Sequence, residues 1–348
     1  MTKNEFSIKD IAKEANVSPA TVSRVFAGNS YVSAKTRELI LQIAQAHNYE
    51  PRAYQKHHYH QKSNLIVGVV VADLHNPFFL DMIDCIENTL NKQGAECIIC
   101  NSNESPQKEI RILDMLKSQA DGIIISPVSE NAEYNVEYMR NLNASGIPII
   151  LIDRDLNSIG LDGVFQDNYN VSVECVETLI RVGHKNIATI AGPISSKPGI
   201  ERLNGYMDTL AAHGISVKKE YITYGNFKAE SGYRLALDLI EHRPEITAIF
   251  CCNNLMAVGA IRAIYSKGLC VPDDIAFISS DSLHTMDTMY NTSISSVEQP
   301  VEQMGEEAAN MMIAKLSSRK KRAKAIRRVT YEGCLNLRGS EAYPKNRK

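Results

Sequence analysis

Apolar residues in the first fifty positions follow a helical spacing in three short runs. The first run starts after Ser7, and its apolar members are Ile8, Ile11, Ala12 and Ala15. These intervals of three and four residues are those of one helix face. Ser7 and Asp10 have the S-x-x-D form of a capping box, and Asn16 is expected to end the helix.

The second run begins at Ser18-Pro19, with the serine as N-cap and the proline at the first helical position. Its apolar face consists of Val22, Val25 and Phe26. Gly28-Asn29 stops it, and a third helix is predicted to start after Ser33. The residues expected to turn inward on that helix are Leu39, Ile40, Ile43 and Ala44. Two short helices joined by a tight turn, with a supporting third, are typical of a helix-turn-helix.

The exposed side of the second helix is small or hydrogen-bonding, which would let it lie deep in a major groove of DNA. The predicted DNA contacts of this unit are Ser18, Pro19, Ala20, Thr21, Ser23, Arg24 and Ser30. Hydroxyl groups can reach phosphates, and Arg24 can donate two hydrogen bonds to a guanine edge. A three-helix protein-binding module would have the same apolar spacing, so the spacing alone leaves both open.

From residue 65 the pattern changes to continuous apolar strands that alternate with helices. The strands include "LIVGVVVAD", "ECIICN", "GIIIS", "PIILID", "NIATIAG", "TAIFCCN" and "IAFISSD". Such runs predict α/β architecture, with parallel sheets covered by helices on both faces. The strands suffice for two doubly wound sheets, and we place the division between them near Asp167-Asn168.

Composition adds an uneven charge to this picture. The chain has 348 residues and a net charge of −2, and its length points to two or three domains. Residues 1–62 hold nine basic and five acidic side chains, a balance of +4, so the remainder carries −6. A basic head favours a polyanionic partner. We expect a cytoplasmic protein without a membrane segment. The cysteines, including Cys97 and Cys100 in a strand predicted to be buried, are expected to serve as small core residues.

Ligands of open α/β sheets bind beyond the carboxyl ends of the strands. The residues found there by position are Asp73, Asn76, Ser126, Asp153, Arg154, Asn253 and Asp281, with Phe78 and Phe79 close by. Carboxylates, amides and a guanidinium can bond vicinal hydroxyl groups, and aromatic faces can cover sugar C–H surfaces. The set therefore predicts a polyhydroxylated ligand.

The head resembles the DNA-binding headpiece of the lactose-repressor (LacI/GalR) family. The matching segments are "IKDIAKEANVSPATVSRVF" and "VSAKTRELILQIAQAHNYEP", and the likeness continues to "LNLRGS" near the C-terminus. The resemblance implies a headpiece at residues 1–50, a hinge at 51–64 and an effector-binding and dimerisation domain at 65–348. Within that domain we expect an N-lobe of about 65–166 and 296–327, and a C-lobe of about 167–295 and 328–340.

The body resembles sugar-binding proteins of the ribose-binding periplasmic type. The matching motifs are "NPFF", "LIDRD", "ERLNGY", "GNFKAESG", "FCCNN", "ISSDS" and "VEQPVEQMG". The effector residues that this likeness implies are Asn76, Phe78, Phe79, Asp153, Arg154, Arg202, Phe227, Asn253, Asp281 and Gln299. All of these positions agree with the pentose-binding pattern.

The favoured function is therefore that of a regulator, most simply a repressor, of a carbohydrate-use operon under the control of ribose or a related pentose. Its expected partners are operator DNA, the sugar and a second copy of the chain, with no cofactor and no metal. A cytoplasmic sugar-binding protein without a regulatory role, and a regulator with a phosphosugar or non-sugar effector, are the alternatives. An enzyme such as a sugar kinase or isomerase is disfavoured, because the sequence has no phosphate-binding loop.

The segment "AYQKHHYHQKSN" lies in the implied hinge. In the family this hinge folds on operator DNA, and a leucine wedges into the minor groove. Here His58 stands at the leucine position. Three interpretations stay open, namely a metal site at His57, His58 and His60, a solvated linker, and a hinge that meets DNA through Lys56 and His58.

If His58 does not intercalate, wild-type DNA bending should be weak, because an imidazole is too polar to make a good wedge between base pairs. His58→Leu should then increase the bend, whereas His58→Ala should cost only a modest, salt-dependent part of the affinity. Circular-permutation gel shifts measure the DNA bend in wild type and in both variants. A large wild-type bend that His58→Ala abolishes would make the histidine itself the wedge, and DNA binding that needs added zinc would favour the metal site.

Overall fold

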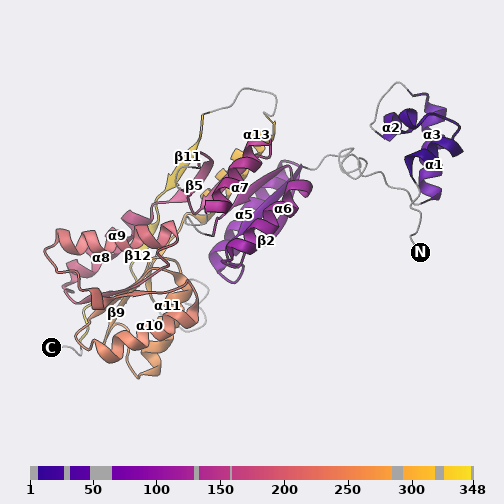
Figure 1. The fold of residues 1–348 in the computed structure, drawn as a ribbon. Coiled ribbons are helices and arrows are strands. Elements are labelled where there is room, and N and C mark those ends of the chain that lie inside the picture. The colour runs from indigo at the N-terminus through magenta and orange to yellow at the C-terminus, as the bar shows by residue number, and fades with distance from the viewer. Residues whose placement is uncertain are drawn as a thin grey trace. The chain divides into compact units, whose positions relative to one another are not determined.

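The computed structural model describes residues 7–26, 32–47, 65–128, 133–156, 159–283, 293–317 and 325–345. The chain forms two compact units, residues 1–65 and 66–348. In the described parts, the first unit contains three helices and the second contains two sheets flanked by helices (Figure 1). Among the described helices, none combines the length and apolar character that crossing a membrane requires.

The first unit has the predicted three-helix pattern. Its helices are α1 (Ile8–Glu14), α2 (Pro19–Phe26) and α3 (Ala34–Ala46). The Asp10 carboxylate accepts a hydrogen bond from the Ser7 N–H at 2.8 Å, and the Ser18 hydroxyl accepts one from the Thr21 N–H at 3.1 Å. The small core contains Ile11, Ala12, Ala15, Val22, Val25, Phe26, Ile40, Ile43 and Ala44. Leu39 was expected inside but is 44% exposed, because it falls at the edge of the apolar stripe of α3.

The first sheet of the second unit belongs to the N-lobe. In spatial order it contains β2 (Ala95–Asn101), β1 (Leu65–Val71), β3 (Gly122–Ile125), β4 (Ile149–Asp153), β5 (Asp162–Gln166) and β11 (Arg328–Tyr331). The strands from β1 to β11 pair in parallel. Helices α5 (Pro77–Lys92) and α13 (Val301–Ser317) cover one face, and α6 (Pro106–Gln119) and α7 (Glu133–Ala144) cover the other.

The second sheet belongs to the C-lobe. In spatial order it contains β7 (Ile222–Tyr224), β6 (Ile187–Ala191), β8 (Ala248–Cys251), β9 (Ala276–Ser279), β10 (Ser295–Glu298) and β12 (Cys334–Asn336). Only β12, paired with β10, runs antiparallel among the strand pairs of this sheet. Helices α8 (Asn168–Val182) and α9 (Lys197–Ala212) pack on one face, and α10 (Ala229–His242) and α11 (Asn254–Ser266) on the other, with a short 3-10 turn, η1 (Lys219–Tyr221), before β7.

Helices α10 and α11 approach each other more closely than side chains would allow. A Cβ at Gly259 would lie 1.8 Å from the Ala229 carbonyl oxygen, and one at Gly232 would lie 2.0 Å from the Met256 carbonyl oxygen. The two glycines therefore allow the first turns of both helices to pack closely, next to Phe227, just before α10, and Asn253, the N-cap of α11.

The chain crosses between the lobes at Asp167, at residues 299–300 and at residues 332–333. The first crossing lies at the division expected from the sequence. The predicted lobe boundaries further along are wrong in two places, because β10 belongs to the C-lobe sheet and β11 to the N-lobe sheet. A strand of four residues carries too little apolar pattern to indicate which sheet it completes. Hydrogen bonding to β9 places β10 in the C-lobe sheet, and hydrogen bonding to β5 places β11 in the N-lobe sheet.

The strand that contains Cys97 and Cys100 also differs from its prediction. It is the edge strand β2, not a fully buried one, and Ile99 within it is 46% exposed. Both cysteines are half-buried and free. An edge strand lacks a neighbour on one side, so an apolar run alone does not guarantee burial.

Candidate functional site

Polar side chains from both lobes gather at the carboxyl ends of the strands. Asp73 follows β1, Asp153 is the last residue of β4, and Asp281 follows β9. Asn253 follows β8 and caps α11, where its side chain accepts a hydrogen bond from the Met256 N–H at 3.1 Å. Parallel strands end at one edge of their sheet, so each lobe contributes a wall of such residues.

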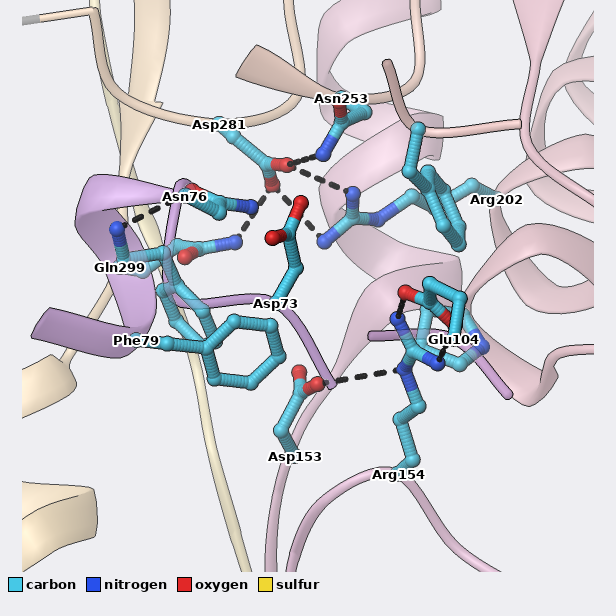
Figure 2. A pocket seen from close by; sticks show the side chains of 13 residues that line it. Asp73, Asn76, Phe79, Glu104, Asp153, Arg154, Arg202, Asn253, Asp281 and Gln299 are labelled. Carbon is cyan, nitrogen blue, oxygen red and sulfur yellow. Dashed lines mark hydrogen bonds and ion pairs between the residues drawn. The ribbon is translucent and has the colours of Figure 1, made fainter. Parts of the chain in front are cut away.

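All ten residues predicted to contact an effector line one pocket (Figure 2). Its lining consists of Asp73, Asn76, Phe78, Phe79, Glu104, Asp153, Arg154, Pro198, Arg202, Phe227, Asn253, Asp281 and Gln299. The cavity volume is about 30 Å³, which is room for no more than a few water molecules. A ligand of the size of a sugar ring would therefore fit only if the side chains or lobes moved apart.

The C-lobe wall is organised around a buried ion pair between Arg202 and Asp281. The two guanidinium nitrogens Nη2 and Nη1 lie 2.8 Å and 3.0 Å from the two carboxylate oxygens. Arg202 also donates to the Cys252 carbonyl at 2.8 Å and to the Asn168 side chain at 2.9 Å. Gln299 donates to the same carboxylate. Asp281 is thus a fixed acceptor whose geometry is determined before any ligand arrives.

The N-lobe wall contains the buried carboxylate of Asp153. It accepts a hydrogen bond from the Ser126 hydroxyl at 3.3 Å. Burial raises the pKa of Asp153 to about 6, although Arg154 and Arg202 act in the opposite direction. Its backbone φ is +65°, and Phe227 across the pocket has a φ of +62°. Such conformations are costly for residues other than glycine and concentrate at functional sites.

Arg154 is held against the N-lobe wall by Glu104. The guanidinium donates to the two Glu104 oxygens at 2.7 Å and 2.8 Å, which is a bidentate pair. The Phe227 ring lies over the guanidinium, with its centroid 5.4 Å from the Arg154 Cζ. Figure 2 shows this pair in the lower part of the pocket and the Arg202–Asp281 pair in the upper part.

Three polar contacts join the lobes around the pocket. Lys228 of the C-lobe donates to Asp73 at 2.5 Å, and Asn254 donates to Asn76 at 2.8 Å. Lys197 of α9 donates to Asp155 at 2.6 Å. Burial alone would raise the pKa of the Asp73 carboxyl, but hydrogen bonds from Lys228 and His75 outweigh it and hold that pKa below its usual value.

Sequence reasoning missed two lining residues, Glu104 and Pro198. Glu104 follows β2, so the strand-end rule would have found it if it had been applied to the edge strand. Pro198 opens α9 and carries no polar group that could have drawn attention. Ser126, which was named by position, is not among the lining residues of the pocket but donates a hydrogen bond to Asp153.

The first unit presents a separate polar surface on α2. Of the predicted DNA contacts, Ser18, Pro19, Ala20, Ser23 and Arg24 are exposed, and Thr21 is half-buried. The apolar side of the helix is buried in the core of the unit. Ser30, Lys56 and His58 lie outside the described residues, as do the other histidines of the hinge. No cluster of three metal-ligating side chains occurs in the part of the chain that the structure describes.

Comparison with known proteins gives matches over nearly the whole chain. Residues 7–52 match the model of bacterial regulatory proteins of the lacI family, and residues 64–333 match periplasmic binding proteins and the sugar-binding domain of the LacI family. The chain is 30% identical over 315 residues to the HTH-type transcriptional repressor PurR of Pasteurella multocida, which covers 90% of this chain and 92% of that one.

Two solved structures illustrate the likeness of fold. The transcriptional regulator CelR in complex with cellobiose has a TM-score of 0.71 and 26% identity, and the match covers 96% of this chain and 99% of that one. The lac repressor dimer bound to operator and the anti-inducer ONPF has a TM-score of 0.68 and 24% identity, with 97% and 99% covered. Both confirm the predicted α/β architecture with N-terminal helices.

The raised pKa of Asp153 predicts a pH-dependent effect of Asp153→Asn. As pH falls through about 6 towards 4, the folded protein takes up a proton that the unfolded chain does not, so this carboxylate destabilises the fold above pH 6 and ceases to do so near pH 4. Asp153→Asn should therefore raise the free energy of unfolding at pH 7.5, by at most about 3 kcal/mol, and the gain should vanish near pH 4.

Urea unfolding of both proteins across this pH range measures the effect. Asp81→Asn, at an exposed position of α5, is a control for the chemical change itself. Parallel stability profiles for wild type and Asp153→Asn between pH 4 and 7.5 would show that Asp153 does not titrate near 6.

Proposed function

The chain belongs to the LacI family of bacterial regulatory proteins, and from that membership we propose that it represses a carbohydrate-use operon in response to ribose or a related pentose. Regulators of this family bind operator DNA and small-molecule effectors, and they are dimeric. The proposal places this chain in the cytoplasm as a homodimer that binds its effector without turning it over.

The observation that carries the proposal is the meeting of the ten pentose-pattern residues in one pocket. Asp281 and Asp153 can accept hydrogen bonds from vicinal hydroxyls, and Asn253 can both donate and accept. Phe78, 5.1 Å from Phe79 between ring centroids, offers an apolar face on one side of the pocket, and Phe227 offers another from the C-lobe. This combination suits a small ring with several hydroxyl groups.

The polar contacts between the lobes support a hinge mechanism. A ligand in the pocket would touch Asp153 of the N-lobe and Asp281 of the C-lobe at once, and would therefore stabilise one lobe arrangement over another. If operator binding prefers a different arrangement, sugar and DNA affinity are linked reciprocally, typically by ~1–3 kcal/mol. We favour release of DNA by the sugar.

Calorimetry with the full chain tests the effector. Titration of ribose, other pentoses, hexoses, purines and amino acids should give saturable binding of ribose or a close pentose, with hexoses next. The same sugar, added to an operator gel shift, should change DNA affinity. Tight binding of a purine or an amino acid, with no sugar bound, would overturn the proposal.

A second test concerns the DNA-reading surface. Arg24→Ala should lose discrimination by ~1–3 kcal/mol at one base pair of each half-site, because a bidentate contact to guanine is lost. Competition binding against single-base operator variants measures it. Arg234→Ala, at an exposed position of α10 in the body, should leave the specificity profile unchanged. A uniform loss at every position in Arg24→Ala would mean that Arg24 contacts phosphate only.

A further inference from the structure

We propose that Glu104 is a specificity-determining residue that restricts the effector pocket to uncharged sugars and excludes phosphorylated ones. The inference rests on the proposed sugar-binding function and names the chemical class that this site accepts. A pocket with two arginines would otherwise be a natural place for a phosphate, because a guanidinium fork matches phosphate oxygens in geometry and charge.

Glu104 occupies the fork of Arg154. Nη2 donates to one carboxylate oxygen at 2.7 Å, and Nη1 donates to the other at 2.8 Å and to the Val128 carbonyl at 3.3 Å. Three N–H donors of this guanidinium are thereby engaged, and its side chain is only 6% exposed. A phosphate would have to displace Glu104 before it could take the same bidentate place.

The other arginine of the pocket is engaged in a similar way. Arg202 forms a two-point pair with Asp281, with separations of 2.8 Å and 3.0 Å, and donates to the Cys252 carbonyl and the Asn168 side chain. Its side chain is 4% exposed. Asp281 is also the acceptor on which hydroxyl recognition depends, so it cannot leave Arg202 without cost to the sugar.

The charge of the lining points the same way. Four carboxylates, Asp73, Glu104, Asp153 and Asp281, face two guanidiniums, which gives −2 when all are ionised. Lys228, which is paired with Asp73, brings this to −1. A phosphate ester carries about −1.5 to −2 at pH 7, and it would meet this negative wall in a buried site where charge repulsion is weakly screened. Without Glu104 the same residues would sum to zero.

Glu104→Gln is the variant that separates charge from shape. The amide keeps the length of the side chain and one acceptor for Arg154, but removes the negative charge and frees one N–H of the fork. Ribose 5-phosphate should bind this variant about tenfold more tightly than wild type, or better, since a hydrogen bond to a charged group contributes on that scale. The Kd for ribose should change much less. Calorimetry with both ligands measures the ratio.

Two variants serve as controls. Glu104→Asp keeps the charge and should retain the preference for ribose over ribose 5-phosphate. Glu137→Gln makes the same chemical change at an exposed position of α7 and should behave as wild type. Thermal melting confirms that each variant is folded. An unchanged ratio of the two Kd values in Glu104→Gln, or a wild type that binds ribose 5-phosphate as tightly as ribose, would overturn the role of Glu104.

The outcome for Glu104 is distinguishable from the outcome for the proposed function. If wild type binds neither ribose nor any other sugar of the panel, the proposed function fails. Inorganic phosphate then serves as the probe of Glu104, and it should bind Glu104→Gln more tightly than wild type or Glu104→Asp. Equal phosphate affinity in all three proteins would end the proposal independently of the sugar result.

Discussion

The buried pair of Arg202 and Asp281 is the interaction on which the organisation of the pocket depends. Two opposite charges lie almost out of contact with water. Arg202 also donates a hydrogen bond to the Cys252 carbonyl, and Asp281 also accepts one from the Gln299 amide. Loss of one partner from such a pair usually costs about 3–5 kcal/mol, because the remaining charge stays buried and unpaired. The pair ties α9 to the loop after β9. It therefore fixes one wall of the pocket before a ligand arrives. We expect ligand binding to change mainly the arrangement of the two lobes.

Polar contacts link the two lobes at the pocket. Asp73 with Lys228, Asn76 with Asn254 and Asp155 with Lys197 all bridge the two walls. Two of these contacts are ion pairs whose lysine side chains are 37% and 29% exposed, and partly exposed ion pairs contribute little to stability. The third, between the two asparagines, is buried. Each lobe interior has a large apolar core of its own, so we expect a change in the lobe arrangement to leave those cores intact. A ligand that touches both walls is thus able to bias the equilibrium.

Much of the fold and the pocket could be predicted from the sequence because both follow from strand ends. Apolar runs indicate parallel strands, and polar residues at the ends of strands in one sheet, such as Asp73 and Asp153 in the N-lobe, must meet at one edge. Features that depend on partners far along the chain were not accessible. The role of Glu104 depends on its hydrogen bonds with Arg154, which lies 50 positions later in the chain. Likewise β10 and β11 were assigned to the wrong lobes, because four residues do not reveal which strand they will pair with.

The late position of β11 and β12 has a consequence for how the protein is made. Residues 328–331 complete the sheet that begins at Leu65, and residues 334–336 complete the other. During synthesis the N-lobe sheet therefore has an open edge at β5 while all strands of the C-lobe sheet except β12 are made. Neither sheet has its full set of described strands until residues 328–336 have emerged, and a nascent chain that stops before residue 328 would leave β5 and β10 as edge strands, the kind of surface on which misassembly starts.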